Sequence, residues 1–140
     1  MKNIFILITL LLLTSLSSFA QGELSPSDWK MTQAKLLTED NKFDDALKIY
    51  EELYSTYPED AFLNFRIALC HFNNGNPEQA KPFIDKSLAN CKESDFSGEM
   101  FFLKSKIYHR IGDFSAALSS LESIPAGAAN VDTLKVKYLK

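Results

Sequence analysis

The chain has 140 residues and a formal net charge of −3, and 46% of its residues are hydrophobic. This length corresponds to roughly one small domain with a modest apolar core. Because the chain is slightly acidic and Lys and Arg never follow one another in a run, neither nucleic acid nor an anionic membrane surface is expected as a partner.

Residues 1–20 have the layout of a secretory signal peptide. Lys2 precedes an apolar run that extends from Ile4 to about Leu16, and the triplet SFA at 18–20 places small residues three and one before a cleavage point. An uncleaved membrane anchor is the alternative, but the run is shorter than the roughly 20 apolar residues of a spanning helix. We predict cleavage after Ala20, no stable membrane insertion afterwards, and a periplasmic or outer-membrane-associated mature chain.

The next segment predicts a capped helix. Residues 21–26 are a short linker, in which Ser25 offers a side-chain cap and Pro26 suits the first helical turn. Asp28, three residues after the cap, completes a capping box. A helix is therefore predicted from about Pro26 to Asp40. Further helices are predicted to start near Asn41, Asn76 and Asp113.

Small residues recur at long, regular intervals along the chain. Ala46 is followed 34 residues later by Ala80 and 37 residues after that by Ala117. Each has a small partner twelve residues earlier: Ala34, Ala68 and Ser105. Two helices joined by a tight turn approach to the short end of the range of about 8–10 Å only where both side chains are small. The pattern predicts three antiparallel helix pairs that cross at these positions.

The residues around the crossings fit this arrangement. Asn41, Gly75 and Gly112 are predicted to end the first helix of each pair, since they tolerate left-handed backbone. Apolar residues at helical spacing are predicted to fill the space between layers: Leu37, Tyr50, Leu53, Ile67, Ile84, Tyr108 and Leu121. No stretch alternates apolar and polar residues for long enough to predict a strand.

The turns NKFDDAL, GNPEQAK and GDFSAAL, with the small residues at the eighth and twentieth positions of each unit, resemble the tetratricopeptide repeat (TPR) family. The resemblance implies an all-α, right-handed superhelical TPR solenoid of three helix-turn-helix repeats plus a C-terminal helix. The repeats are expected over 27–125, divided into 27–60, 61–97 and 98–125. Residues 126–140 are expected to form a loop followed by either a capping helix or the first helix of a fourth repeat.

Exported TPR segments of this kind also resemble the amino-terminal parts of larger Gram-negative envelope proteins. Those proteins continue into a β-propeller and an OmpA-like peptidoglycan-binding domain. Neither domain occurs within residues 1–140. Two alternatives for function follow from the resemblance: a non-catalytic protein–protein interaction scaffold of the cell envelope, or a structural amino-terminal spacer of an outer-membrane, peptidoglycan-associated assembly.

Catalytic and metal-binding signatures are sparse. His71 and His109 fall in different repeats, and no HExxH or CxxC motif accompanies them. Cys70 and Cys91 are expected at distant ends of neighbouring helices, too far apart for a disulfide. We therefore expect neither an enzyme nor a bound cofactor or metal.

The TPR resemblance implies that a protein or peptide segment binds along the inner face formed by the first helices. The implied groove residues are Met31, Lys35, Phe65, Arg66, Leu69, Phe72, Phe102, Lys106 and His109. Arg66 and Lys106 would orient an acidic group of an apolar or amphipathic segment. In the alternative, Phe65 and Phe72 pack against neighbouring helices or against a remainder of the protein outside residues 1–140.

Overall fold

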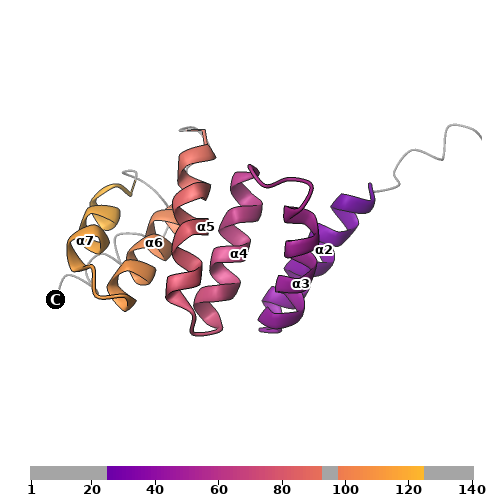
Figure 1. Cartoon of the computed structure of the whole chain (residues 1–140), viewed down its shortest axis with the longest axis horizontal. Helices are drawn as coiled ribbons and strands as arrows, with labels where there is room; N and C mark the ends of the chain where they lie inside the picture. Colours follow the sequence, from indigo (N-terminus) through magenta and orange to yellow (C-terminus); the bar gives the residue numbers. More distant parts are fainter. Residues whose placement is uncertain (1–24, 93–97, 125–140) are drawn as a thin grey trace, which may run out of the picture.

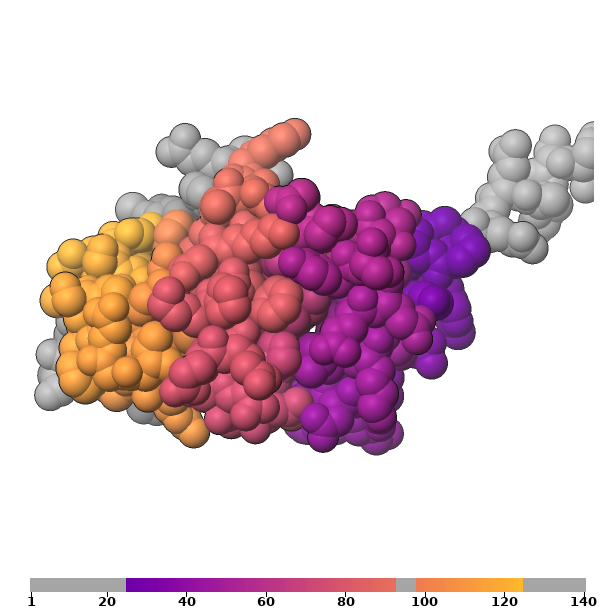
Figure 2. Space-filling view, in the orientation of Figure 1, coloured from indigo at the N-terminus to yellow at the C-terminus, as the bar shows by residue number. Residues whose placement is uncertain are grey.

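The computed structural model describes residues 25–92 and 98–124, and within these ranges it consists of α-helices without a strand. In chain order they are α2 (Pro26–Glu39), α3 (Phe43–Tyr54), α4 (Ala61–Asn73), α5 (Pro77–Asn90), α6 (Gly98–Arg110) and α7 (Phe114–Glu122). Consecutive helices form three hairpins, α2–α3, α4–α5 and α6–α7, that lie side by side in chain order (Figures 1 and 2). The predicted signal peptide and the predicted C-terminal helix lie outside the described residues.

The turns within the three hairpins share one backbone conformation. Asn41, Gly75 and Gly112 have φ values of 60°, 81° and 86°. The residue after each of them donates its N–H to a carbonyl five residues earlier, from Lys42 to Leu37 at 2.8 Å, from Asn76 to His71 at 2.9 Å and from Asp113 to Tyr108 at 2.9 Å. Left-handed residues at these positions satisfy the last carbonyls of the first helix, so the predicted helix ends are confirmed.

The predicted helix starts are correct in part. Ser25 accepts from the backbone N–H of Asp28 at 3.1 Å, and the Asp28 carboxylate accepts from the N–H of Ser25 at 3.3 Å, which confirms the capping box. Asn41 does not start α3, however, because its left-handed backbone ends α2, and Lys42 precedes the first helical residue without a side-chain cap.

The small residues lie where the helices of each hairpin meet. Ala34, Ala46, Ala68 and Ala80 are 0% exposed, while Ser105 and Ala117 are 3% and 6% exposed. The predicted interior residues Tyr50, Ile67 and Ile84 are likewise fully buried, and Leu37 packs at the edge of the first layer. Ala34 and Ala46 share one core cluster and Ala68 and Ala80 share another, which fits the predicted approach of the paired helices at small residues.

The first two layers of the core are joined because α4 contributes to both. Leu63, Ile67 and Cys70 pack with α2 and α3, whereas Phe65 and Ala68 pack with α5 and α6. Cys91 contacts this second layer, so the two cysteines belong to different clusters and form no disulfide.

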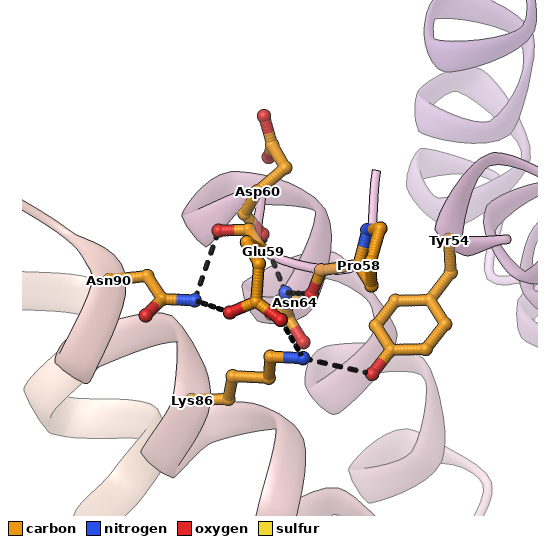
Figure 3. Close-up of polar contacts among 7 residues, drawn as sticks. All are labelled: Tyr54, Pro58, Glu59, Asp60, Asn64, Lys86 and Asn90. Atoms are coloured by element: carbon orange, nitrogen blue, oxygen red, sulfur yellow. Dashed lines mark hydrogen bonds and ion pairs between the residues drawn. The ribbon is translucent and has the colours of Figure 1, made fainter. Parts of the chain in front are cut away.

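Polar contacts fasten the loop between α3 and α4 to the second hairpin (Figure 3). The fully buried Asn64 donates from Nδ2 to the carbonyls of Pro58 at 2.9 Å and Asp60 at 2.7 Å. On α5, Lys86 lies 2.7 Å from the Glu59 carboxylate, and Asn90 donates to the backbone and side chain of Glu59. The connection between the first two hairpins is therefore held in place from α4 and from α5.

A second polar cluster joins α5 to α6. The Asp85 carboxylate pairs with Lys104 at 2.9 Å and with Lys81 at 3.3 Å, and it accepts from the Tyr108 hydroxyl at 2.7 Å. Burial raises the pKa of Asp85, but hydrogen bonds from Lys104 and Tyr108 outweigh it and hold the pKa below its ordinary value. The charged carboxylate is thus favoured at the boundary between the second and third hairpins.

Candidate functional site

A shallow hollow of about 180 Å³ lies between the first helices of the second and third hairpins. It is lined by Phe65, Arg66 and Leu69 of α4 and by Glu99, Phe102, Leu103 and Lys106 of α6. We call this surface, together with the adjoining Phe72 and Arg110, the α4–α6 groove. Phe65 and Leu69 on α4, and Phe102 and Lys106 on α6, are four positions apart, the spacing that places side chains on one helical face.

The apolar floor of the groove is partly core. Phe65 is only 7% exposed and packs with Ala68, Ile84 and Met100 in the second layer. Leu69 and Phe72 are half-buried at the edge of the same layer. Phe65 and Phe72 therefore do pack against neighbouring helices, yet Phe65 also borders the hollow, and Leu69 supplies more accessible apolar surface than Phe65 does.

Cations lie over the aromatic rings of this groove. The Lys106 Nζ atom is 4.9 Å from the ring centre of Phe72 and 5.5 Å from that of Phe102. The Arg110 guanidinium is 5.7 Å from the Phe72 centre, and that of Arg66 is 5.6 Å from the Phe65 centre. Burial lowers the pKa of the Lys106 ammonium, and the Arg110 charge lowers it further.

These three cations lack a carboxylate partner within the described part of the chain. Its ion pairs involve Lys30, Lys42, Lys48, Lys81, Lys86 and Lys104. Arg66, Lys106 and Arg110 are absent from that set, although they are held against aromatic rings. The groove accordingly combines an apolar floor with three cations that form no ion pair within residues 25–92 and 98–124, and the acidic Glu99 also lines the hollow.

Three of the nine residues expected in the groove lie elsewhere. Met31 lines a separate hollow of about 300 Å³ between the first hairpin and the start of α4. Lys35 is exposed on α2. The His109 ring packs edge-on against Phe114 at 5.2 Å, towards α7. The other six, Phe65, Arg66, Leu69, Phe72, Phe102 and Lys106, lie along the contact between α4 and α6.

Sequence reasoning missed three residues of the groove. Glu99 and Leu103 line the hollow, and Arg110 lies over Phe72. A usable signal was present, because Glu99 precedes the predicted Phe102 by three positions, and Leu103 and Arg110 lie three and four positions from the predicted Lys106. This spacing places each on the same helical face as a predicted residue.

Histidine, cysteine and acidic side chains are dispersed over residues 25–92 and 98–124. No group of three or more His, Cys, Asp or Glu side chains there could hold a metal ion. His71 is 9% exposed and stacks on Phe83 at 5.5 Å, and burial lowers its pKa. None of the helices in these two ranges has the length and apolar character needed to cross a membrane.

Three helical hairpins that cross at small residues, with a groove between successive first helices, define a TPR-type helical solenoid. Repeats of this class generally mediate protein–protein interactions and generally act as non-catalytic scaffolds. Residues 39–124 match the family model described as ANAPC3, "Anaphase-promoting complex, cyclosome, subunit 3". The chain belongs to this TPR-type repeat family. The anaphase-promoting complex in the family's description refers to the protein after which the family is named.

A solved structure supports the fold. The C-terminal part of a TPR repeat-containing protein from Cytophaga hutchinsonii aligns with a TM-score of 0.65 and 18% identity, over 76% of this chain. The alignment spans 40% of the Cytophaga chain, so the similarity concerns the fold of the repeats alone. No curated protein matches the sequence. The family match and the structural alignment together confirm the predicted all-α TPR solenoid.

Proposed function

We propose that this chain is a non-catalytic scaffold of the cell envelope that binds a segment of a partner protein in the α4–α6 groove. The observation that carries the proposal is the coincidence, in one hollow, of accessible apolar side chains with cations that have no carboxylate partner among the described residues. A partner that supplies apolar and acidic side chains would match both features.

The geometry favours a short segment over a broad surface. The hollow is about 180 Å³, which accommodates a few side chains. Leu69 and Phe102 are half-buried. An apolar side chain of the partner placed against them would therefore remove their remaining exposed surface from water. Each Å² of apolar surface removed from water contributes about 25 cal/mol, and a few such side chains would give a weak, reversible complex.

Replacing Leu69 by serine is expected to weaken the binding of groove peptides about tenfold, the equivalent of about 1.4 kcal/mol of lost apolar contact. Peptides would first be selected from a displayed random library on the wild-type mature chain. Their affinities for wild type and variant would then be compared by fluorescence anisotropy. Circular dichroism would show whether the variant remains helical.

The matched control is Leu36→Ser, since Leu36 is 57% exposed on α2, away from the groove. It should leave the affinity of the same peptides unchanged. If the selected peptides bind wild type and Leu69→Ser equally well, the groove does not bind them and the proposed function fails.

The envelope location rests on residues 1–20, and we propose that they direct export. Intact-mass analysis of the protein from an envelope fraction should show a chain that begins at Gln21. Replacing Ala20 by tyrosine should leave the segment attached, because the processing site requires a small residue before the cut. Wild-type protein recovered from the cytosol with residues 1–20 intact would contradict export.

A further inference from the structure

The charge of the α4–α6 groove differs between its two ends. Glu99, in the first turn of α6, lines the same hollow as Arg66 in the first half of α4. At the other end, Lys106 and Arg110 of α6 lie over Phe72 of α4. These contacts show that α4 and α6 run in the same direction, with opposite charges at one end and two like charges at the other.

The two cations at the Phe72 end are held in position before any ligand binds. Lys106 lies between the rings of Phe72 and Phe102, and Arg110 lies over Phe72 from one helical turn further along α6. A cation over an aromatic face is stabilised by the ring quadrupole. Groups that are already ordered lose less conformational entropy when a ligand arrives, so such a pair is suited to anion binding.

Among residues 25–92 and 98–124, the neighbouring titratable groups leave this pair unneutralised. Glu99 lies at the opposite end of the hollow, and the next acid along α6 and its turn, Asp113, caps α7 by accepting from the N–H of Ala116 at 3.0 Å. His109 is directed at Phe114. Lys106 and Arg110 therefore repel each other at four-residue spacing, a destabilising arrangement that a bound anion would relieve.

We infer that the Phe72 end of the groove is the carboxylate-binding end, and this inference rests on the proposed function. A carboxylate of the partner segment binds between Lys106 and Arg110, while the segment's apolar side chains contact Leu69 and Phe102 towards the Arg66 end. Arg66, which the sequence suggested as an orienting cation, lies over the Phe65 ring at 5.6 Å and does not belong to the pair over Phe72.

The helix geometry sets the spacing of the recognised side chains. Phe102 precedes the midpoint of Lys106 and Arg110 on α6 by six helical residues, which is about 9 Å. An extended segment covers that distance in about three residues. The preferred ligand is therefore an extended peptide with an acidic residue about three positions from an aromatic or aliphatic residue.

A charge-reversal selection tests the inference. The displayed peptide library would be selected separately on the wild-type mature chain, on the double variant Lys106→Glu plus Arg110→Glu, and on Lys35→Glu as the charge-reversal control, since Lys35 is exposed on α2 outside the groove. Wild type and Lys35→Glu should enrich acidic residues about three positions from an apolar residue. The double variant should enrich Lys or Arg at that position instead.

Synthetic peptides would quantify the result. For wild type, changing the acidic residue of the selected peptide to its amide should weaken binding about tenfold, as expected for a half-exposed charged hydrogen bond. If Lys106→Glu plus Arg110→Glu loses helical structure, Lys106→Gln plus Arg110→Gln replaces it, and with this variant the acid and amide peptides should bind equally.

The outcomes separate the inference from the proposed function. Peptides that depend on Leu69 but show no acidic preference, or whose acidic preference survives removal of both Lys106 and Arg110, would overturn the inference and leave the groove as a binding site. Peptides whose binding is independent of Leu69 would overturn both.

Discussion

Replacing Ala80 by leucine is expected to lower the free energy of unfolding by about 1–3 kcal/mol, because an enlarged side chain in a packed interior forces its surroundings apart. Ala80 is 0% exposed on α5 and packs in the same cluster as Ala68 of α4, which is also 0% exposed. The added atoms would therefore enter the crossing of the second hairpin, where α4 and α5 approach closely.

Ala89→Leu is the matched control, because Ala89 is exposed on the same helix. Alanine and leucine are both strong helix formers, so intrinsic helix propensity changes similarly in the two variants. Urea denaturation followed by circular dichroism would compare them. Equal denaturation midpoints for Ala80→Leu and Ala89→Leu would show that the small residue at the crossing is not required for close packing.

The second large effect is expected at the boundary between α5 and α6. Asp85→Asn should lower the free energy of unfolding by about 1–2 kcal/mol, since hydrogen bonds to charged groups contribute most when they are partly buried. The carboxylate has three partners, Lys81, Lys104 and the Tyr108 hydroxyl. Its side chain is 32% exposed, which limits the expected loss through screening by solvent.

The contribution of Asp85 to the free energy of unfolding should decrease as the pH falls. Its pKa is lower in the folded chain than its ordinary value, so its stabilisation is present above about pH 4, near the unfolded pKa, and is lost as the pH falls through the folded pKa. Denaturation curves of wild type and Asp85→Asn should therefore differ at neutral pH and converge in acid.

The control for this experiment is Asp45→Asn. Asp45 forms an exposed ion pair with Lys48 at 2.9 Å on the surface of α3. Because exposed pairs contribute little, this variant should leave the denaturation midpoint unchanged at neutral pH. A difference between wild type and Asp85→Asn that stays constant down to pH values well below 4 would show that the carboxylate's charge is not what stabilises the boundary.

Features that depend on local chemistry could be predicted from the sequence. Gly75 and Gly112 end their helices because left-handed backbone is accessible to glycine without steric cost, and Asn41 tolerates it. The capping box at Ser25 involves two residues three positions apart. The start of α3 was placed too early because Asn41 has both the chemistry of a cap and that of a left-handed helix end, and the turn requires the second.

The candidate site was predictable only in part. Helical spacing identified the face of α4 that carries Phe65, Leu69 and Phe72, but it could not predict how far each side chain is buried. Phe65 is mostly buried because α5 and α6 cover it, which depends on residues up to about 40 positions away. Met31 and Lys35 occupy corresponding positions in the first hairpin, yet the groove forms only where α4 meets α6.

By itself, the sequence determined the hairpins, since turn residues, caps and the spacing of small residues act within about 34 positions of one another. Only the tertiary structure decided which side chains of neighbouring hairpins meet. The position of Lys106 and Arg110 over Phe72 illustrates this, because the contact joins two hairpins. The physical reason is that helix formation depends on nearby residues, whereas groove shape and charge depend on how separate hairpins pack together.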